Sequence, residues 1–335
     1  MPLSVYVDCR HVHWPSFPRA FFSRRSMMPR SSRSLPSLTP EAFSSDRFVL
    51  GEAPHTLDCR PGSPALDGAH VMGILNVTPD SFSDGGQYVT VEKAVSRAAE
   101  MLSEGASIVD VGGESTRPGA DPVGPEDERD RVVPVIEALS EQFPEALLSI
   151  DTYKPTVARA ALAAGADIVN DVTGLRHRPE MAEAAADWGA PLVVMHSEGE
   201  PGDLTRPREY DDVTAEVRDA LARSVETAKE AGVEQIIIDP GFGFGKSNDE
   251  NLRLLNEVDE LLALNRPVLV GVSRKSTIGA TLGTPERPAP VDERLHGSLG
   301  ATAVAVMRGA TIVRTHDVAP TVDMLRVMGH TLRRH

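Results

Sequence analysis

One pattern recurs about eight times between residue 71 and the end of the chain: a short apolar run, a polar loop and a stretch with helical periodicity. The apolar residues in each run are consecutive rather than alternating, which is typical of parallel strands that are covered on both faces. Eight such units in about 265 residues predict an α/β protein with a (β/α)8 or TIM-barrel fold. A doubly wound open sheet is the alternative.

The expected elements can be placed by residue number. The strands are expected at 71–75, 107–113, 147–151, 167–171, 191–196, 235–240, 267–273 and 311–316. The helices include 91–104, 155–164, 212–231, 249–263, 297–308 and 318–333. Upstream of these elements, residues 56–70 predict a short hairpin that closes the floor of the barrel.

The N-terminal segment differs in composition from the rest of the chain. Residues 1–40 contain six arginines, no lysine and one acid, together with many serines and prolines. Three interpretations of residues 1–45 stay open: an organelle-targeting segment, a disordered extension, or a start codon placed too far upstream, with Met27 or Met28 as the true start. We assign residues 46–335 to the barrel domain and leave 1–45 out of the fold prediction.

The charge of the chain argues against nucleic acid as a partner. Its net charge is −15, and residues 41–335 hold 28 basic and 48 acidic residues. A domain this acidic repels phosphates, although such a charge favours solubility and suits a high-salt habitat. No apolar run approaches the roughly 18–20 residues of a membrane span. With only Cys9 and Cys59, we expect a reducing compartment such as the cytoplasm.

Polar residues follow the expected strands at or just beyond the carboxyl end of each. They are Asn76, Asp110, Asp151, Asn170, His196, Asp239, Ser273, Arg314 and His316. A TIM barrel carries its active site at this end of the strands, on the loops that lead into the helices. The pattern therefore predicts a functional site at the rim of the barrel.

Three aspartates at this rim suggest the chemistry of a ligand. Asp110, Asp151 and Asp239 each follow an apolar run, and for any one of them a helix cap is an equally good interpretation. Together they would surround one cavity and need hydrogen-bond donors to offset the cost of desolvation. A flat N–C–N donor edge, as in a pteridine or guanine ring, offers a carboxylate two parallel hydrogen bonds. Asn170 adds a donor and an acceptor.

Basic residues are expected at the same rim and indicate an anion site. They are Arg274, Lys275, Arg314 and His316. The loop 112–120, "GGESTRPGA", adds Thr116 and Arg117. The segment 240–247, "PGFGFGKS", resembles a phosphate-binding P-loop, but Pro240 stands where that motif needs glycine, so we reject a nucleoside triphosphatase.

Eight motifs occur in order along the chain: "GILNVTPDSFSDGG", "DVGGESTRPGA", "SIDTYKP", "NDVTG", "DPGFGFGK", "GVSRKS", "ERLHGSLG" and "RTHDV". With them, residues 56–335 resemble the dihydropteroate synthases of the pterin-binding family. The resemblance implies a transferase that joins 6-hydroxymethyl-7,8-dihydropterin pyrophosphate to p-aminobenzoate, giving 7,8-dihydropteroate and pyrophosphate in folate biosynthesis. It also implies a homodimer, a sulfonamide target and an SN1-like reaction in which the C–O bond breaks first.

The resemblance further implies a role for each matching residue. The pterin contacts are Asp151, Asn170, Asp239 and Lys275. The p-aminobenzoate contacts are Phe82, Thr116, Pro118, Phe244 and Ser276. The pyrophosphate contacts are Asn76, Arg117, Arg314 and His316, and Asn76 also matches a contact to Mg²⁺. Asp151, Lys275, Arg314 and His316 are the expected catalytic residues, whereas Asp110 is placed less firmly and is expected to structure the loops.

The loop 76–86 is expected to close over the substrates, with the loop 112–120 as its partner. At Ser197 and Glu198 the chain departs from the family pattern, which has Met and then Lys or Gln at these positions. This departure predicts a pterin affinity that differs from that of the family.

Two alternative functions stay open. One alternative function is a pterin-dependent methyltransferase, which should lack "SRKS" and "RTHDV". The other is a catalytically silent paralogue that only binds pterin or a partner.

Overall fold

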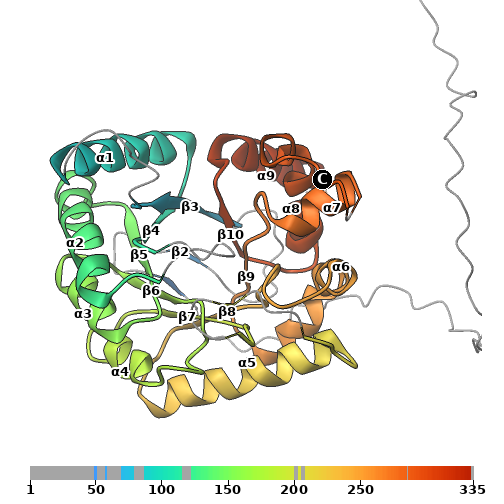
Figure 1. Cartoon of the computed structure of the whole chain (residues 1–335), viewed down its shortest axis with the longest axis horizontal. Coiled ribbons are helices and arrows are strands. Elements are labelled where there is room, and N and C mark those ends of the chain that lie inside the picture. The colour runs from blue at the N-terminus through green and yellow to red at the C-terminus, as the bar shows by residue number, and fades with distance from the viewer. Residues whose placement is uncertain are drawn as a thin grey trace, which may run out of the picture. The chain divides into compact units, whose positions relative to one another are not determined.

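The fold is described from a computed structural model of the chain, shown in Figure 1. The structure describes residues 49–50, 57–58, 69–78, 87–114, 122–199, 203–204, 208–284 and 286–332. All of them belong to one compact unit, Phe43–His335. The predictions for residues 1–45, for most of the loops 76–86 and 112–120, and for Phe82, Thr116, Arg117 and Pro118 lie outside the described residues.

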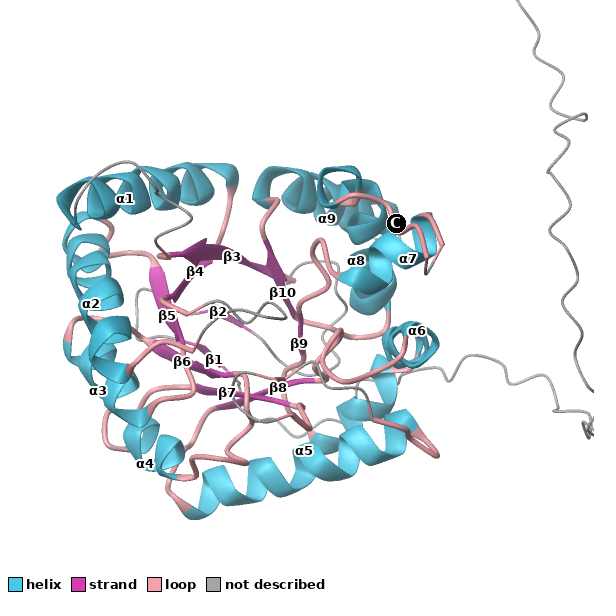
Figure 2. Ribbon diagram, in the orientation of Figure 1, coloured by secondary structure: helices cyan, strands magenta, loops and turns pink. Residues whose placement is uncertain are grey.

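Eight parallel strands form a barrel that is closed by a single bridge (Figures 1 and 2). They are β3 (His70–Asn76), β4 (Ile108–Gly112), β5 (Leu147–Asp151), β6 (Ile168–Asp171), β7 (Leu192–Met195), β8 (Ile236–Asp239), β9 (Leu269–Val270) and β10 (Ile312–Thr315). Their order in the sheet is β8-β7-β6-β5-β4-β3-β10-β9. The bridge pairs Ile238 with Val268 and joins β8 to the start of β9. The TIM-barrel prediction is confirmed, and the open sheet is excluded.

Helices alternate with the strands and form a ring outside the barrel wall (Figure 2). They are α1 (Gln87–Glu104), α2 (Pro125–Gln142), α3 (Pro155–Ala163), α4 (Glu180–Ala186), α5 (Val213–Glu230), α6 (Asn248–Asn256), α7 (Ser276–Leu282), α8 (Leu295–Met307) and α9 (Val318–Leu332), with the 3-10 helices η4 (Val258–Leu264) and η5 (Val291–Glu293). The single helix expected at 249–263 is in fact α6 followed by η4. The two are separated at Glu257, where φ is −117° and ψ is 21°, so the helical hydrogen-bond pattern cannot continue.

A two-stranded antiparallel ribbon precedes the barrel. β1 (Val49–Leu50) pairs with β2 (Leu57–Asp58). The hairpin therefore begins earlier than the predicted range of 56–70, and residues 59–68 of that range lie outside the described residues. Val49 and Leu50 suit a strand. Closure of the barrel floor by this ribbon stays a prediction.

The barrel interior is filled by one apolar side chain from each strand. This layer consists of Met72, Ile108, Leu147, Ile168, Val193, Ile237, Leu269 and Ile312, all buried. Side chains in a strand alternate between its two faces, so the residue two positions later again faces the interior. In four strands that residue is Asp110, Asn170, Asp239 or Arg314. The apolar layer thus forms the base on which the polar rim is built.

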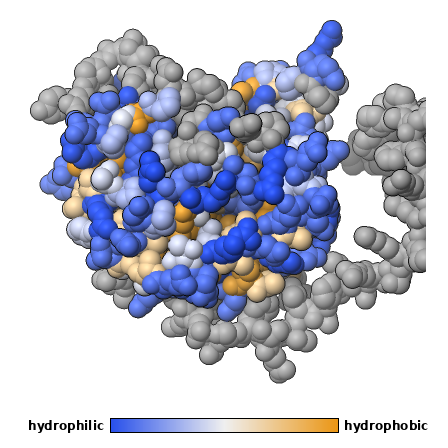
Figure 3. All heavy atoms as spheres, turned by 60° about the horizontal axis from the view of Figure 1, so that its bottom comes forward, coloured by the Kyte–Doolittle hydropathy of each residue, from blue (hydrophilic) through white to orange (hydrophobic). Residues whose placement is uncertain are grey.

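The outer surface differs from this interior. On the face drawn in Figure 3, hydrophilic residues dominate and apolar residues lie between them. Among the described helices, none has both the length and the apolar character needed to cross a membrane.

Candidate active site

Arg314 occupies the centre of the polar rim. From β10 its Nε donates a hydrogen bond to Asp110 Oδ2 of β4, and its Nη2 donates one to Asp151 Oδ2 of β5, each at 2.6 Å. Asn170 Nδ2 of β6 donates to the same oxygen of Asp110 at 3.1 Å. One guanidinium therefore links side chains from across the barrel mouth. These bonds are charge-assisted, which makes them strong where water is excluded.

Asp110 is the most deeply placed of these acids. Its side chain is completely buried, and its Oδ1 has no hydrogen-bond partner among the described residues. An unsatisfied buried carboxylate oxygen is costly, so a donor from a ligand or a water is expected there. The structure thus gives Asp110 a central position, whereas the sequence placed it less firmly.

Asp151 and Asn76 flank a bare stretch of backbone at the barrel mouth. The register pairs Asn76 with Gly112 and Gly112 with Asp151. A Cβ atom at Gly112 would lie 3.6 Å from Asp151 Cβ and 3.7 Å from Asn76 Oδ1. Burial raises the pKa of Asp151 to about 7, and the positive charge of Arg314 partly opposes this rise. The bare Gly112 backbone thus lies between an amide oxygen and a carboxyl group.

Asp239 and Lys275 form the opposite side of the rim. Asp239 Oδ1 accepts a hydrogen bond from the backbone N–H of Gly241 at 2.7 Å. Lys275 Nζ donates to the carbonyl of Phe242 at 2.5 Å and lies 4.3 Å from the centroid of the Phe244 ring. Burial raises the pKa of Asp239 and lowers that of Lys275 to about 8, while the attraction between the two charges opposes both shifts.

The loop after β8 can form only because it is rich in glycine. Gly241, Gly243 and Gly245 have positive φ values of 69°, 81° and 66°, a conformation that glycine adopts without strain. Lys246 Nζ donates to the carbonyls of Gly241 and Phe244, at 2.9 Å and 3.1 Å. Because this ammonium group binds its own loop, it is not presented as the lysine of a P-loop would be. This agrees with our rejection of a nucleoside triphosphatase.

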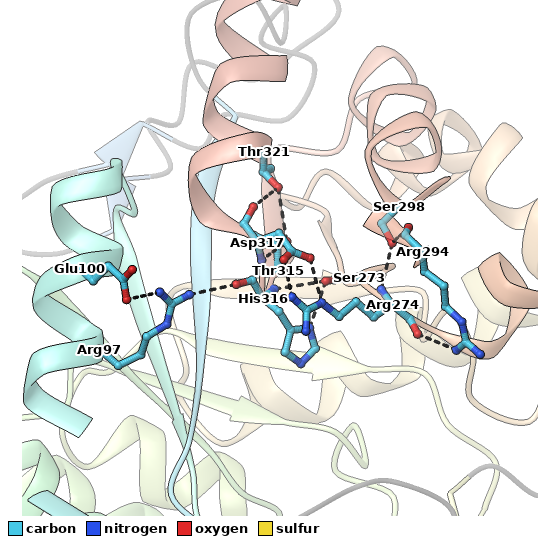
Figure 4. Close-up of polar contacts among 10 residues, drawn as sticks. All are labelled: Arg97, Glu100, Ser273, Arg274, Arg294, Ser298, Thr315, His316, Asp317 and Thr321. Carbon is cyan, nitrogen blue, oxygen red and sulfur yellow. Dashed lines mark hydrogen bonds and ion pairs between the residues drawn. The ribbon is translucent and has the colours of Figure 1, made fainter. Parts of the chain in front are cut away.

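His316 lies next to Ser273 at the ends of β10 and β9 (Figure 4). Its backbone N–H donates to Ser273 Oγ at 3.2 Å, and its Nδ1 lies 3.0 Å from the same oxygen. Ser276 is exposed at the first position of α7, directly after Lys275. Every predicted site residue that the structure describes therefore belongs to the strand ends of one rim or the loops that follow them.

Ser197 and Glu198, the two departures from the family pattern, contact residues outside the predicted substrate contacts. Ser197 Oγ donates to the carbonyl of Val172 at 3.0 Å. Glu198 pairs with Arg176 at 2.9 Å and with Arg208 at 2.6 Å. Both line a cavity of about 410 Å³ beside α5. The predicted pterin contacts do not line this cavity, and the effect of the two departures on pterin affinity stays a prediction.

One buried cluster of charged residues was not predicted from the sequence. Lys154 Nζ binds the carboxylates of Glu114 and Glu128, and Tyr153 Oη donates to Glu114 at 3.1 Å. The cluster attaches the stem of the loop 112–120 to α2 and to the loop after β5. Lys154 and Glu114 belong to two of the family motifs, "SIDTYKP" and "DVGGESTRPGA". The first turn of α2, however, is acidic, and such a sequence normally indicates a helix end that is exposed to solvent. Its Glu128 is nonetheless buried, and no pattern in the sequence indicates this.

The mouth of this barrel combines the carboxylates of Asp110, Asp151 and Asp239 with the Asn170 amide and the buried cations of Lys275 and Arg314. Such a set of groups can bind a flat polar ring together with an anion. Comparison with known proteins agrees with this geometry. Residues 72–316 match the family model described as "Pterin binding enzyme". The dihydropteroate synthase of Escherichia coli strain K12 is 47% identical over 269 residues, which are 80% of this chain and 93% of the relative.

Solved structures give the same result. The dihydropteroate synthase of Xanthomonas albilineans with 4-aminobenzoic acid has a TM-score of 0.77 and 46% identity, and the match covers 87% of this chain and 100% of that chain. A second structure of that enzyme, in complex with 7,8-dihydropteroate, has a TM-score of 0.74 and 43% identity over 86% of this chain and 100% of the other. The chain therefore belongs to the pterin-binding enzymes and, among them, to the dihydropteroate synthases.

Proposed function

We propose that the chain joins 6-hydroxymethyl-7,8-dihydropterin pyrophosphate to p-aminobenzoate, giving 7,8-dihydropteroate and pyrophosphate for folate biosynthesis. The observation that carries this proposal is the barrel mouth itself. It brings together Asp151, Asn170, Asp239 and Lys275 around the Arg314 guanidinium. The carboxylates and the amide can accept hydrogen bonds from the donor edge of a pterin, and the two cations can bind a phosphate.

Pterin recognition follows from the hydrogen-bond capacity of these side chains. Asp239 uses one oxygen for the Gly241 N–H, which leaves acceptor sites for a ring N–H. Asp151 is bound by Arg314 in the described structure, so a pterin would have to share or replace that bond. Because the site is buried, each properly paired hydrogen bond discriminates strongly against ligands that lack the donor.

The reaction breaks the bond between the methylene carbon and the pyrophosphate oxygen. The electron pair leaves with pyrophosphate, and the positive charge that remains is delocalised into the pterin ring. Arg314 and His316 stabilise the departing anion, and the Asp151 carboxylate stabilises the cationic ring, because preorganised charges act strongly in a site that excludes water. The amine of p-aminobenzoate then attacks the methylene carbon and loses one proton. A neutral aniline is nucleophilic enough to need little help from a base.

A magnesium site fits the residues present. Asn76 offers an amide oxygen across Gly112 from Asp151, and Mg²⁺ commonly takes one or two protein oxygens together with substrate phosphates and water. When bound, the ion would neutralise part of the charge that develops on pyrophosphate. The p-aminobenzoate pocket is expected at Phe244 and Ser276, with Phe82, Thr116 and Pro118 contributed by the loops.

The two rival functions are less well supported. A pterin-dependent methyltransferase has no evident use for the rim cations Lys275, Arg314 and His316. A silent paralogue would be free to lose Asn76 or Lys275, yet both are present beside intact carboxylates. We therefore favour the active synthase.

We also propose a homodimer in a reducing compartment such as the cytoplasm. The compartment rests on the presence of only two cysteines in the chain. The dimer rests on α8, whose sequence from Leu295 to Met307 contains no Asp, Glu, Lys or Arg. A helix that is apolar on all sides normally has both faces covered.

The test is the reaction itself. Purified protein with Mg²⁺, the pterin pyrophosphate and labelled p-aminobenzoate should give labelled dihydropteroate, and removal of the metal should abolish product. Lys275→Ala should keep the fold and lose activity by about 100-fold or more, because it removes both a pterin contact and a cation. A sulfonamide should compete with p-aminobenzoate. Pterin binding by the wild type without any product would favour the silent paralogue.

A further inference from the structure

We propose that Asp317 is a positioning residue: its ion pair with Arg274 joins the loops after β9 and β10, so that Lys275 and His316 reach the substrate in one arrangement. This inference rests on the proposed function of the site. Asp317 is not among the predicted substrate contacts, and Arg274, which the sequence placed near the anion site, is bound by Asp317. Their effect on the reaction would therefore pass through their chain neighbours, Lys275 and His316.

The ion pair itself has the geometry of a specific contact. Arg274 Nε donates to Asp317 Oδ2 at 3.0 Å, and Arg274 Nη2 donates to Asp317 Oδ1 at 2.5 Å (Figure 4). Two parallel bonds between a guanidinium and a carboxylate fix orientation as well as distance. The side chain of Asp317 is 15% exposed and that of Arg274 is 40% exposed, so solvent reaches the carboxylate less than it reaches an ordinary surface acid.

The backbone of Arg274 shows why such a contact is needed. Its φ is +60°, a left-handed conformation that is unfavourable for a residue with a side chain. Two groups from the region of α8 hold it there. The N–H of Arg274 donates to Ser298 Oγ at 3.0 Å, and its carbonyl accepts from Arg294 Nη1 at 2.9 Å. The next residue is Lys275, so this strained turn sets the direction in which the Lys275 side chain leaves the loop.

The ion pair between Arg274 and Asp317 also holds the loop after β10. The N–H of Asp317 donates to Thr315 Oγ1 at 3.1 Å, and Thr321 Oγ1 of α9 donates to the carbonyl of Asp317 at 2.7 Å. His316 directly precedes Asp317 and contacts Ser273, which directly precedes Arg274. The two loops are thus joined at two successive residue pairs, Ser273 with His316 and Arg274 with Asp317.

The Ser273 contact also holds the imidazole in place. Ser273 Oγ accepts the backbone N–H of His316 and lies 3.0 Å from Nδ1 of its ring, so one hydroxyl contacts both the backbone and the side chain of this residue. Displacement of the β9 loop would therefore disturb both the direction of Lys275 and the position of the His316 ring, which is why the ion pair matters for both.

The first experiment compares Asp317→Asn with a matched control. Asn keeps the size of the side chain but removes the charge. The control is Asp323→Asn, which breaks an ion pair with Arg326 on α9 whose side chains are 76% and 68% exposed. Binding of the pterin pyrophosphate is measured by calorimetry without p-aminobenzoate, so that no turnover occurs.

We expect Asp317→Asn to weaken this binding roughly 10- to 100-fold, because small misplacements of a binding group have effects of that size. Asp323→Asn should bind as the wild type does. Asp317→Glu, which restores the carboxylate, should recover part of the loss. Unchanged or tighter binding in Asp317→Asn would overturn the proposal; tighter binding would mean that Asp317 merely withholds Arg274 from the anion.

A double-mutant cycle tests whether the effect passes through Arg274. If the two residues act through one contact, Arg274→Gln with Asp317→Asn should lose no more affinity than the worse single variant. Losses that add would show independent roles and contradict the inference.

A ligand-free measurement separates this inference from the proposed function. Amide hydrogen exchange at residues 273–276 and 316–317 should be faster in Asp317→Asn than in Asp323→Asn and the wild type. Unchanged exchange would overturn the positioning role whatever the protein binds. Failure of the wild type to bind the pterin pyrophosphate would instead count against the function.

Discussion

Lys275 is the residue at which burial should be visible in a pH profile. Its pKa is lowered to about 8 by burial and held up by Asp239. In the free enzyme, the ammonium group is therefore lost as the pH rises through about 8, and with it a donor and a positive charge. We expect the affinity for the pterin pyrophosphate to fall over that range, as measured by calorimetry between pH 7 and 9.

The control for this prediction is Lys275→Arg, because a guanidinium does not titrate there. Its affinity at pH 7 should be lower than that of the wild type, since Arg has a different shape, but it should not decline around pH 8. If both proteins lose affinity in parallel, another group is responsible for the decline.

The residues of the rim were the most predictable part of the site. Asp110, Asp151, Asn170, Asp239 and Arg314 follow apolar runs, and a parallel barrel brings all such positions to one mouth. The ion pair between Arg274 and Asp317 was not predictable. It joins positions 43 residues apart, and a sequence shows which loops share a rim without showing which side chains meet across it.

Among the elements, the loop after β8 shows how backbone conformation controls a side chain. A Cβ atom at Gly243 would lie 2.8 Å from Lys275 Cδ, and its φ is +81°. Gly243→Ala should therefore both strain the loop and displace Lys275. We expect the affinity for the pterin pyrophosphate to fall about tenfold or more, together with a loss of about 1–2 kcal/mol in the free energy of unfolding.

Gly189→Ala separates these two effects. Gly189 has a φ of +64°, and a Cβ atom there would have nothing within 4 Å. It should lose about 1 kcal/mol in the free energy of unfolding, from backbone strain alone, with unchanged ligand affinity. Equal affinities for the two variants, measured beside urea unfolding, would show that the contact between Gly243 and Lys275 has no role.

The strands and the helices α1, α3, α5, α8 and α9 were predicted to within a few residues, because eight consecutive apolar runs have few other interpretations. The helix α2 was given no range in the prediction. Two further exceptions have local causes. The helix expected at 249–263 divides at Glu257, where no proline or glycine marks the break. The ribbon of β1 and β2 uses strands of two residues each, too short for any periodicity to reveal.

At the scale of the whole molecule, α8 places apolar residues where solvent is expected. Its buried face carries Ser298, Thr302, Ala305 and Val306, whereas Val304 and Met307 are 41% and 65% exposed. The exposed face of an ordinary amphipathic helix does not carry such large apolar residues. Leu282 of α7 and Leu252 of α6 are also among the exposed large apolar residues, and these three helices lie together on one side of the barrel (Figure 1).

A second copy of the chain would cover this face, which gives the last prediction. Met307→Asp places a charge there, and burial of an unpaired charge in an interface is costly. The variant should sediment as a monomer at concentrations where the wild type is a dimer, and it should keep its unfolding cooperativity. Trp188→Asp is the control, because Trp188 is 53% exposed beside α4, on a different part of the ring, and it should leave the dimer intact. A wild type that sediments as a monomer, or a Met307→Asp variant that stays dimeric, would show that α8 is not an interface and that its apolar face is exposed to water.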